Sequence, residues 1–194
     1  LGDAHPVAIA AWRLLIASVL LMPLAGRDLA KVRELNGWQW LALIGAGVAL
    51  ALHFFAWIGA VQNTTVANAA TFLSFNPVIT STLGWIFFRE KVSRLLAISI
   101  GLGIAGVFIM GWSDFSLAPE HLWGDGLALI CSLLFTIYFL LGKVVRKVIP
   151  TTAYVAAIYG VAAIAGFTSL LALGLPVIDY SALTWHCFVL MALG

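Results

Sequence analysis

The sequence contains little charge. Only 9% of its 194 residues are Asp, Glu, Lys or Arg, whereas 63% are hydrophobic. A soluble domain carries about 25% charged residues, so a soluble fold of this length would lack the polar surface needed to cover its core. The charges nearly balance, at a net +2, and form no basic patch, which argues against a nucleic-acid partner. The composition therefore predicts a protein whose main solvent is lipid.

Cysteine and catalytic motifs are scarce as well. Cys131 and Cys187 lie inside apolar runs with no second thiol or histidine at ligand spacing, so neither a disulfide framework nor a zinc site is expected. The sequence has no HExxH motif, no serine-centred motif and no aspartate pair, which argues against a membrane-embedded protease. No basic segment with a cleavage site follows Leu1, so we expect no signal peptide. We expect no metal and no cofactor.

Long apolar runs are what the sequence does contain. A membrane-spanning helix needs roughly 17–25 mostly apolar residues, whereas barrel strands are shorter and alternate in polarity. We therefore expect an all-α integral membrane protein, a polytopic helical bundle. The last run offers only 12 residues, about 18 Å of helix, so we expect it to be cut short. The seven runs are 6–24, 38–61, 66–88, 95–112, 126–142, 148–175 and 183–194.

Residues typical of helix ends flank these runs. Pro6 and Pro150 suit a first helical turn. Thr64 or Thr65, Ser93 and Ser181 are predicted N-caps, and Gly26 and Gly174 are predicted stops.

The basic residues predict the orientation of the chain. Nine of the ten Lys and Arg residues lie in the first, third and fifth connections, and the connections between these contain none. Because positively charged loops stay in the cytoplasm, we expect loops 25–37, 89–94 and 143–149 to be cytoplasmic. The protein is then a multi-pass protein of the cell (inner) membrane.

Several motifs resemble one family of transporters. They are 11–17 (AWRLLIA) with Met22-Pro23, 60–77 (AVQNTTVANAATFLSFNP), 88–91 (FREK), 100–107 (IGLGIAGV) and 124–129 (GDGLAL). In this order they resemble the drug/metabolite transporter superfamily, EamA type. The resemblance covers nearly the whole chain.

The resemblance implies ten helices in two inverted five-helix repeats, with both termini cytoplasmic. This chain would then hold helices two to eight. Residues 1–113 would form the first repeat without its first helix, and 124–194 the second repeat, truncated after about three helices. Inverted repeats place a substrate site near the membrane midplane. The implied partners are a small-molecule substrate and the lipid bilayer, with a homo-oligomer as an open alternative to a monomer.

Ionisable side chains inside the spans are candidates for function, because charge in lipid is costly. The predicted spans contain no Asp or Glu, and only Arg13, His53 and His186 qualify. Arg13 lies about 10 Å below the outer boundary. There it either reaches outward in a structural role, which we favour, or binds an anion or a carboxylate on the missing first helix. His53 shares a helix face with Trp57, and either lines the substrate pathway or packs against a neighbouring carbonyl.

The run 66–88 is the most polar span. Asn68, Thr71 and Phe75 fall on one helical stripe, which either bonds helices together or lines a watery cavity. Pro77 should bend this helix near the midplane and serve as a gating kink. In the run 126–142, we expect a facing pathway surface formed by Ser132, Phe135 and Tyr138.

The run 95–112 has a different character. Gly101, Gly103 and Gly106 provide small-residue spacings without a buried polar group. Such spacings are typical of close helix packing, not of a ligand site.

Transport is the function that these features favour. We expect export of an amino acid or related amphipathic solute by alternating access, without enzymatic activity. A seven-helix receptor or retinal photoreceptor is an alternative, but a retinal protein needs a buried lysine and a carboxylate, which the spans lack. A membrane-embedded enzyme is another alternative, and a flippase for a lipid-linked substrate of the same superfamily stays open.

Overall fold

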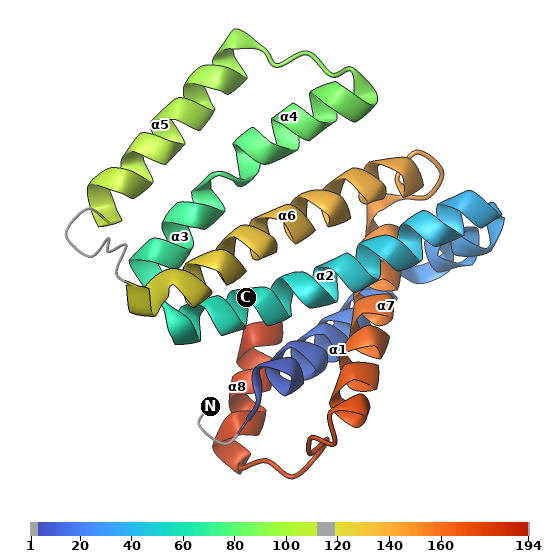
Figure 1. Cartoon of the computed structure of the whole chain (residues 1–194). Helices are drawn as coiled ribbons and strands as arrows, with labels where there is room; N and C mark the ends of the chain where they lie inside the picture. The colour runs from blue at the N-terminus through green and yellow to red at the C-terminus, as the bar shows by residue number, and fades with distance from the viewer. Residues whose placement is uncertain (1–3, 112–118, 194) are drawn as a thin grey trace. The chain divides into compact units, whose positions relative to one another are not determined.

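The described part of the chain, residues 4–111 and 119–193 of a computed structural model, consists of helices and the turns that join them (Figure 1). This confirms the predicted all-α class. The helices are α1 (Pro6–Ala25), η1 (Gly26–Glu34), α2 (Gly37–Asn63), α3 (Val66–Ser74), α4 (Asn76–Phe88), α5 (Arg94–Gly111), η2 (Pro119–His121), α6 (Leu122–Val145), α7 (Thr151–Ala172) and α8 (Ala182–Leu193).

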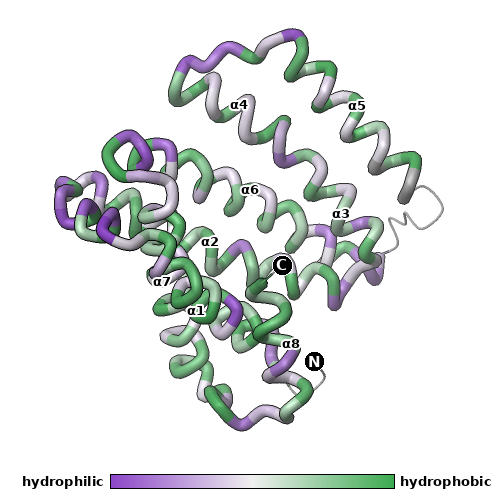
Figure 2. Tube along the Cα trace, turned by 180° about the vertical axis from the view of Figure 1, so that it is seen from behind, coloured by the Kyte–Doolittle hydropathy of each residue, from purple (hydrophilic) through white to green (hydrophobic). Residues whose placement is uncertain are grey.

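Five helical segments of the described chain are long and apolar enough to cross a membrane. The apolar segments Arg94–Gly106 of α5 and Ala182–Leu193 of α8 are shorter. Hydrophilic residues gather at the turns, and the helices between them are mostly hydrophobic (Figure 2). The five long segments are Pro6–Glu34, Gly37–Asn63, Val66–Phe88, Pro119–Val145 and Thr151–Ala172.

Most helix ends lie at the capping residues that the sequence predicted. Thr65, Ser93 and Ser181 each accept a backbone N–H three residues ahead through the side-chain hydroxyl, at 3.1, 3.1 and 3.3 Å. Such bonds satisfy donors that a helix start leaves unpaired. Gly26 and Gly174 follow the ends of α1 and α7 with φ of +48° and +63°, a backbone conformation that glycine adopts without strain.

Three details of the helices go beyond or differ from the prediction. Pro150 is the N-cap of α7 and lies one residue before its first turn. Within the predicted connection 25–37, residues Gly26–Glu34 form a 3₁₀ helix. The span predicted for 66–88 is present, but in place of one bent helix it consists of two helices, α3 and α4, which meet at Phe75.

The break at Phe75 follows from Pro77. In a continuous helix the N–H of residue 77 would bond to the carbonyl of Leu73, but proline has no N–H and its ring crowds that carbonyl. The N–H of Phe75 instead donates to the carbonyl of Phe72, at 3.3 Å, which tightens the last turn of α3. The Phe75 carbonyl accepts from Ile79 at 3.0 Å, so α4 begins immediately afterwards.

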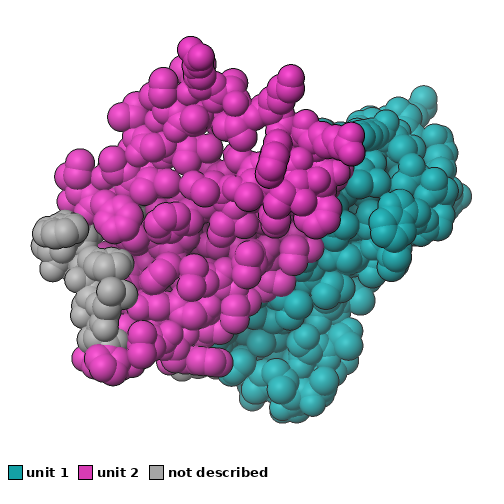
Figure 3. Space-filling view, turned by 45° about the horizontal axis from the view of Figure 1, so that its top comes forward, with its two compact units in different colours: residues 1–55, 141–194 teal, residues 56–140 magenta. Residues whose placement is uncertain are grey.

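The chain divides into two compact units, coloured separately in Figure 3. Unit 1 comprises residues 1–55 and 141–194, and unit 2 comprises residues 56–140. These units do not follow the predicted division into repeats at 1–113 and 124–194, which concerns topology and stays a prediction.

In unit 1, α1 lies against α7 and α8. Small residues let the α1 and α7 backbones approach: a Cβ built on Gly166 would lie 2.9 Å from the Cβ of Ala11. Ser18 in α1 donates its hydroxyl to the carbonyl of Ala156 in α7, at 3.1 Å. In lipid the hydrophobic effect does not drive helices together. Close backbone approach and a hydrogen bond from a hydroxyl group are common ways to join helices there.

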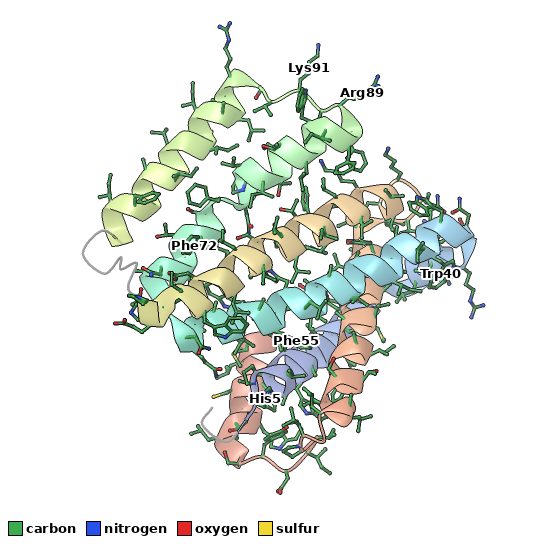
Figure 4. The ribbon with its side chains drawn as sticks, in the orientation of Figure 1. His5, Trp40, Phe55, Phe72, Arg89 and Lys91 are labelled. Atoms are coloured by element: carbon green, nitrogen blue, oxygen red, sulfur yellow. The ribbon has the colours of Figure 1, made fainter. Side chains whose placement is uncertain are left out.

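In unit 2, α3 contacts both α4 and α5. A buried cluster of Ala60, Ala69 and Ala128 joins the end of α2, α3 and α6, and Trp57 packs against this cluster. Arg89 and Lys91 lie in the turn between α4 and α5, away from the packed helices (Figure 4).

Candidate functional site

A buried carboxylate connects the ends of helices in unit 2. Asp125 lies in the first turn of α6 and is only 4% exposed. Its Oδ1 accepts the Thr64 hydroxyl at 2.7 Å and the Asn68 side-chain amide at 3.2 Å. Asp125 lies one residue before the predicted span 126–142, and no role was predicted for it. Its burial between two donors makes it part of a polar joint between α3 and α6.

Gly124 explains how Asp125 comes so close to the α2–α3 connection. A Cβ on Gly124 would lie 2.5 Å from the carbonyl carbon of Asn63 and 2.6 Å from the nitrogen of Thr64. Both are backbone atoms, which cannot rotate out of the way. Only glycine therefore fits here, and the GDG motif at 124–126 was the sequence signal for this contact.

Other polar side chains in unit 2 also bond helix to helix. Ser132 donates its hydroxyl to the Phe72 carbonyl at 3.1 Å, and the hydroxyls of Thr80 and Thr136 lie 3.1 Å apart. Thr71 donates to its own helix at Ala67, at 2.8 Å. Of the polar stripe predicted on 66–88, Asn68 bonds to α6 and Thr71 bonds within α3, while Ser132 and the Thr80–Thr136 pair add further bonds to α6. A pathway role for Asn68, Thr71 and Ser132 stays a prediction.

A cavity of about 550 Å³ lies at the break between α3 and α4. We call it the break pocket. Asn76 is one of the residues that line it, and the Oδ1 of Asn76 is buried and has no hydrogen-bond partner among the described residues. The residues that line the break pocket are Leu73, Ser74, Asn76, Pro77, Leu96, Ser99, Ile100, Gly103, Ile104 and Phe135.

Aromatic rings lie at and near the break pocket. Phe135 meets Tyr138 edge-on, with ring centroids 5.6 Å apart, and stacks with Phe139 at 6.4 Å. Phe75, at the break itself, meets Phe108 edge-on at 6.4 Å. Of the residues predicted to line the pathway, the structure thus places Phe135 in the pocket, with Tyr138 against it. Asn76 and Ser74 were missed, although the sequence Asn76-Pro77 at the predicted bend was a usable signal.

In unit 1, Arg13 lies over an aromatic ring. Its guanidinium carbon is 4.8 Å from the ring centroid of Phe54, which is typical of a cation–π contact. His53 meets the same Phe54 ring edge-on at 5.2 Å and is 9% exposed. A cavity of about 190 Å³, which we call the Arg13 pocket, is lined by Arg13, Leu14, Ala17, Phe54, Tyr159, Ala192 and Leu193.

Trp12, the neighbour of Arg13, fixes this part of α1. Its indole N–H donates to the carbonyl of Val177 in the α7–α8 connection, at 2.7 Å. Its ring meets Phe167 and Trp185 edge-on, with centroids 5.1 and 4.7 Å apart. The motif at 11–17 therefore combines a small residue for helix contact, an anchored tryptophan and a cation.

The remaining predicted residues lie elsewhere. A Cβ built on Gly101, Gly103 or Gly106 meets no described heavy atom within 4 Å, so the expected close helix packing finds no partner in the described structure. That role stays a prediction. His186 lies 2.6 Å from the Ala182 carbonyl within its own helix. No group of three or more His, Cys, Asp or Glu among the described residues could hold a metal ion.

The sequence profile of the EamA-like transporter family matches residues 1–112. The chain belongs to this family. This confirms the resemblance to the drug/metabolite transporter superfamily that the motifs indicated.

Relatives of this EamA-family chain carry the names of transporters and of flippase subunits. An uncharacterized transporter of Bacillus subtilis, YwfM, is 28% identical over 165 residues, which is 84% of this chain and 54% of YwfM. A probable 4-amino-4-deoxy-L-arabinose-phosphoundecaprenol flippase subunit, ArnE of Hamiltonella defensa, is 27% identical over 50% of this chain and 94% of ArnE. The chain thus spans about half the length of YwfM.

A solved crystal structure supports the fold of this EamA-family chain. It aligns with all of the chain and with 66% of its own length, with a TM-score of 0.75 at 17% sequence identity. At that identity the likeness shows the fold alone.

Proposed function

We propose that this EamA-family protein exports a small amphipathic solute, an amino acid or related metabolite, by alternating access. The break pocket is the observation that supports this most directly. Its volume of about 550 Å³ falls in the range of about 300–1,000 Å³ that small-molecule pockets occupy. Its lining is mainly apolar with a few polar groups, which suits a solute that has both an apolar part and hydrogen-bonding ends.

Asn76 is the polar group on which recognition would depend. A buried amide oxygen without a partner costs about 1–3 kcal/mol, and a donor on the solute, such as an ammonium or amide N–H, would recover that cost. Phe135 offers an aromatic face to the apolar part of the solute. Recognition would thus combine one acceptor with one ring.

The broken helix also suits the proposed mechanism. Transporters of several folds place their substrates where a membrane helix is interrupted, because the interruption exposes polar backbone beside a cavity. Pro77 prevents α3 and α4 from fusing, so this interruption persists whatever else moves. We propose Pro77 as the kink that allows α4 to change direction during the transport cycle.

We further propose that the protein lies in the inner membrane and that 25–37, 89–94 and 143–149 face the cytoplasm, as their basic residues favour. Transport in this scheme leaves the solute covalently unchanged. No described residue cluster suggests metal chemistry.

A second candidate function rests on a specific observation. Three of the relatives are named as probable ArnE flippase subunits, 27–29% identical to this chain. A lipid-linked solute would then be the cargo, and the break pocket would hold its headgroup.

The test is a panel transport assay. The complete gene product is reconstituted into proteoliposomes, and counterflow of each of the twenty amino acids is measured. We expect flux for at least one apolar amino acid, and we expect Asn76→Ala to reduce it about 2- to 10-fold because one hydrogen bond is lost. Asn63→Ala is the matched control, since Asn63 is exposed and bonds only within α2, to the Gly59 carbonyl. No flux for any amino acid refutes the proposed solute class.

A further inference from the structure

The Arg13 pocket presents a cation within a membrane-spanning helix. The Arg13 guanidinium lies over the Phe54 ring. Within residues 4–111 and 119–193 it makes neither an ion pair nor a hydrogen bond. A charge in lipid is costly unless it is paired or reaches water. A hydrogen-bond acceptor for the five N–H donors of this side chain would therefore be stabilising.

Snorkelling to the membrane surface does not account for this geometry. Arg13 lies seven residues after the start of α1 at Pro6, about 10 Å of helical rise. Phe54 lies nine residues before the end of α2 at Asn63, about 14 Å of rise. Because the guanidinium is stacked on this mid-helix ring, the cation stays at depth. A guanidinium tolerates such a position because an aromatic face replaces part of its hydration.

Tyr159 adds a second donor to the same pocket. Its ring comes from α7, and its hydroxyl has no hydrogen bond to any described residue. The backbone of α7 is held close to α1 here, since a Cβ on the adjacent Gly160 would lie 3.3 Å from the Ser18 hydroxyl oxygen. Two uncommitted donors thus line one small cavity.

The size of the cavity limits what these donors can bind. Its volume is about 190 Å³, somewhat more than the 150 Å³ engineered cavity that is known to hold benzene. A carboxylate with a few attached atoms fits such a space. The fork of a guanidinium matches the two oxygens of a carboxylate in a bidentate bond.

We propose that the Arg13 pocket binds the carboxylate of the transported solute at a stage of the transport cycle other than the one in which the solute occupies the break pocket, with the Arg13 guanidinium and the Tyr159 hydroxyl as donors and the Phe54 ring holding the guanidinium in place. This inference rests on the proposed function, because it names the charged group of the exported amino acid. It reverses the structural role favoured for Arg13 from sequence alone.

The experiment compares an acid with its own amide. The probes are the panel amino acid with the highest flux in the complete gene product, the carboxamide of that amino acid, and dioctanoyl phosphatidic acid as a lipid phosphate. Wild type, Arg13→Gln, Tyr159→Phe and the control Arg27→Gln are assayed. Arg27 is exposed in η1, so its replacement removes the same charge away from the pocket.

We expect Arg13→Gln to raise KM for the acid about 10- to 100-fold and Tyr159→Phe to raise it about 2- to 10-fold. The carboxamide should have a similar KM in wild type and in both variants, because it brings no charge to the pocket. Arg27→Gln should leave every KM unchanged.

Three results would overturn the inference, and each differs from a failure of the proposed function. In the first, wild-type flux is normal but Arg13→Gln changes KM for acid and carboxamide equally. In the second, Arg13→Gln lowers the thermal midpoint and the flux without changing either KM, as a structural cation would. In the third, phosphatidic acid competes in wild type and not in Arg13→Gln, while the acid binds both equally, which assigns the pocket to a lipid phosphate. Absence of flux in wild type instead refutes the proposed function, and the inference with it.

Discussion

Replacing Gly124 by alanine tests the close contact between α6 and the α2–α3 connection. The new Cβ would lie 2.5 Å from a backbone atom of Asn63, whereas ordinary contact begins at 3.4 Å, so one backbone must shift by about 0.9 Å. Overpacking of this kind costs about 1–3 kcal/mol. The shift would also move Asp125 away from the donors that it accepts.

Gly126→Ala is the matched control for this substitution. It lies two residues further along the same helix, and a Cβ there meets nothing within 4 Å. Both substitutions gain up to about 1 kcal/mol of helix propensity, so that gain cancels when the two variants are compared. The difference in unfolding free energy between them is therefore the cost of the contact, about 1–3 kcal/mol.

Thermal unfolding of the complete gene product in detergent measures this difference. For a chain of this length 1 kcal/mol corresponds to about 2–4 °C, so Gly124→Ala should unfold about 2–12 °C below Gly126→Ala. Equal midpoints for the two variants would refute the argument that backbone contact requires glycine at position 124.

Three further predictions concern the polar joint, the orientation and the pathway. Asp125→Ala should be less stable than Asp125→Asn by about 1–3 kcal/mol, because only asparagine keeps an oxygen that can accept the Thr64 hydroxyl. Its thermal midpoint should therefore be lower, and equal midpoints would count against the polar joint. In a cysteine-free background, Glu120→Cys should react with an impermeant maleimide added to sealed cells and Lys147→Cys should not, and the reverse pattern rejects the orientation. His53→Ala and Trp57→Ala should each reduce amino-acid flux at unchanged membrane abundance, measured by immunoblot, and normal flux in both removes these residues from the pathway.

Helix positions could be predicted because they depend on neighbouring residues. An apolar run of sufficient length specifies a span, and the caps at Thr65 and Ser93 bond to N–H groups only three residues away. The kink was predictable for the same reason, because Pro77 acts on a carbonyl four residues before it. The extent of the kink was not, since a bend and a complete break differ only in how the surrounding helices pack.

Partners of the polar side chains could not be predicted from such local patterns. Asp125 bonds to Asn68 and Thr64, which lie 57 and 61 positions earlier in the chain. No periodicity in the sequence connects Asp125 with these two residues. A helical wheel correctly grouped Asn68 with Thr71, but it could not show that the Asn68 amide is committed to a carboxylate. The Arg13 pocket was missed for a similar reason, because Phe54 and Tyr159 lie on two other helices.

The break at Phe75 allows α4 to change direction as a rigid helix. Phe75 is the one residue between the two helices, and its ψ of −9° differs from the −42° of an ideal helix. The 13 residues of α4 extend about 20 Å beyond it. A change of about 15° in direction at this residue displaces the far end of α4 by about 5 Å. Rotation about two backbone bonds is thus enough to carry the Phe88 end across the width of a side chain, with every hydrogen bond inside both helices intact.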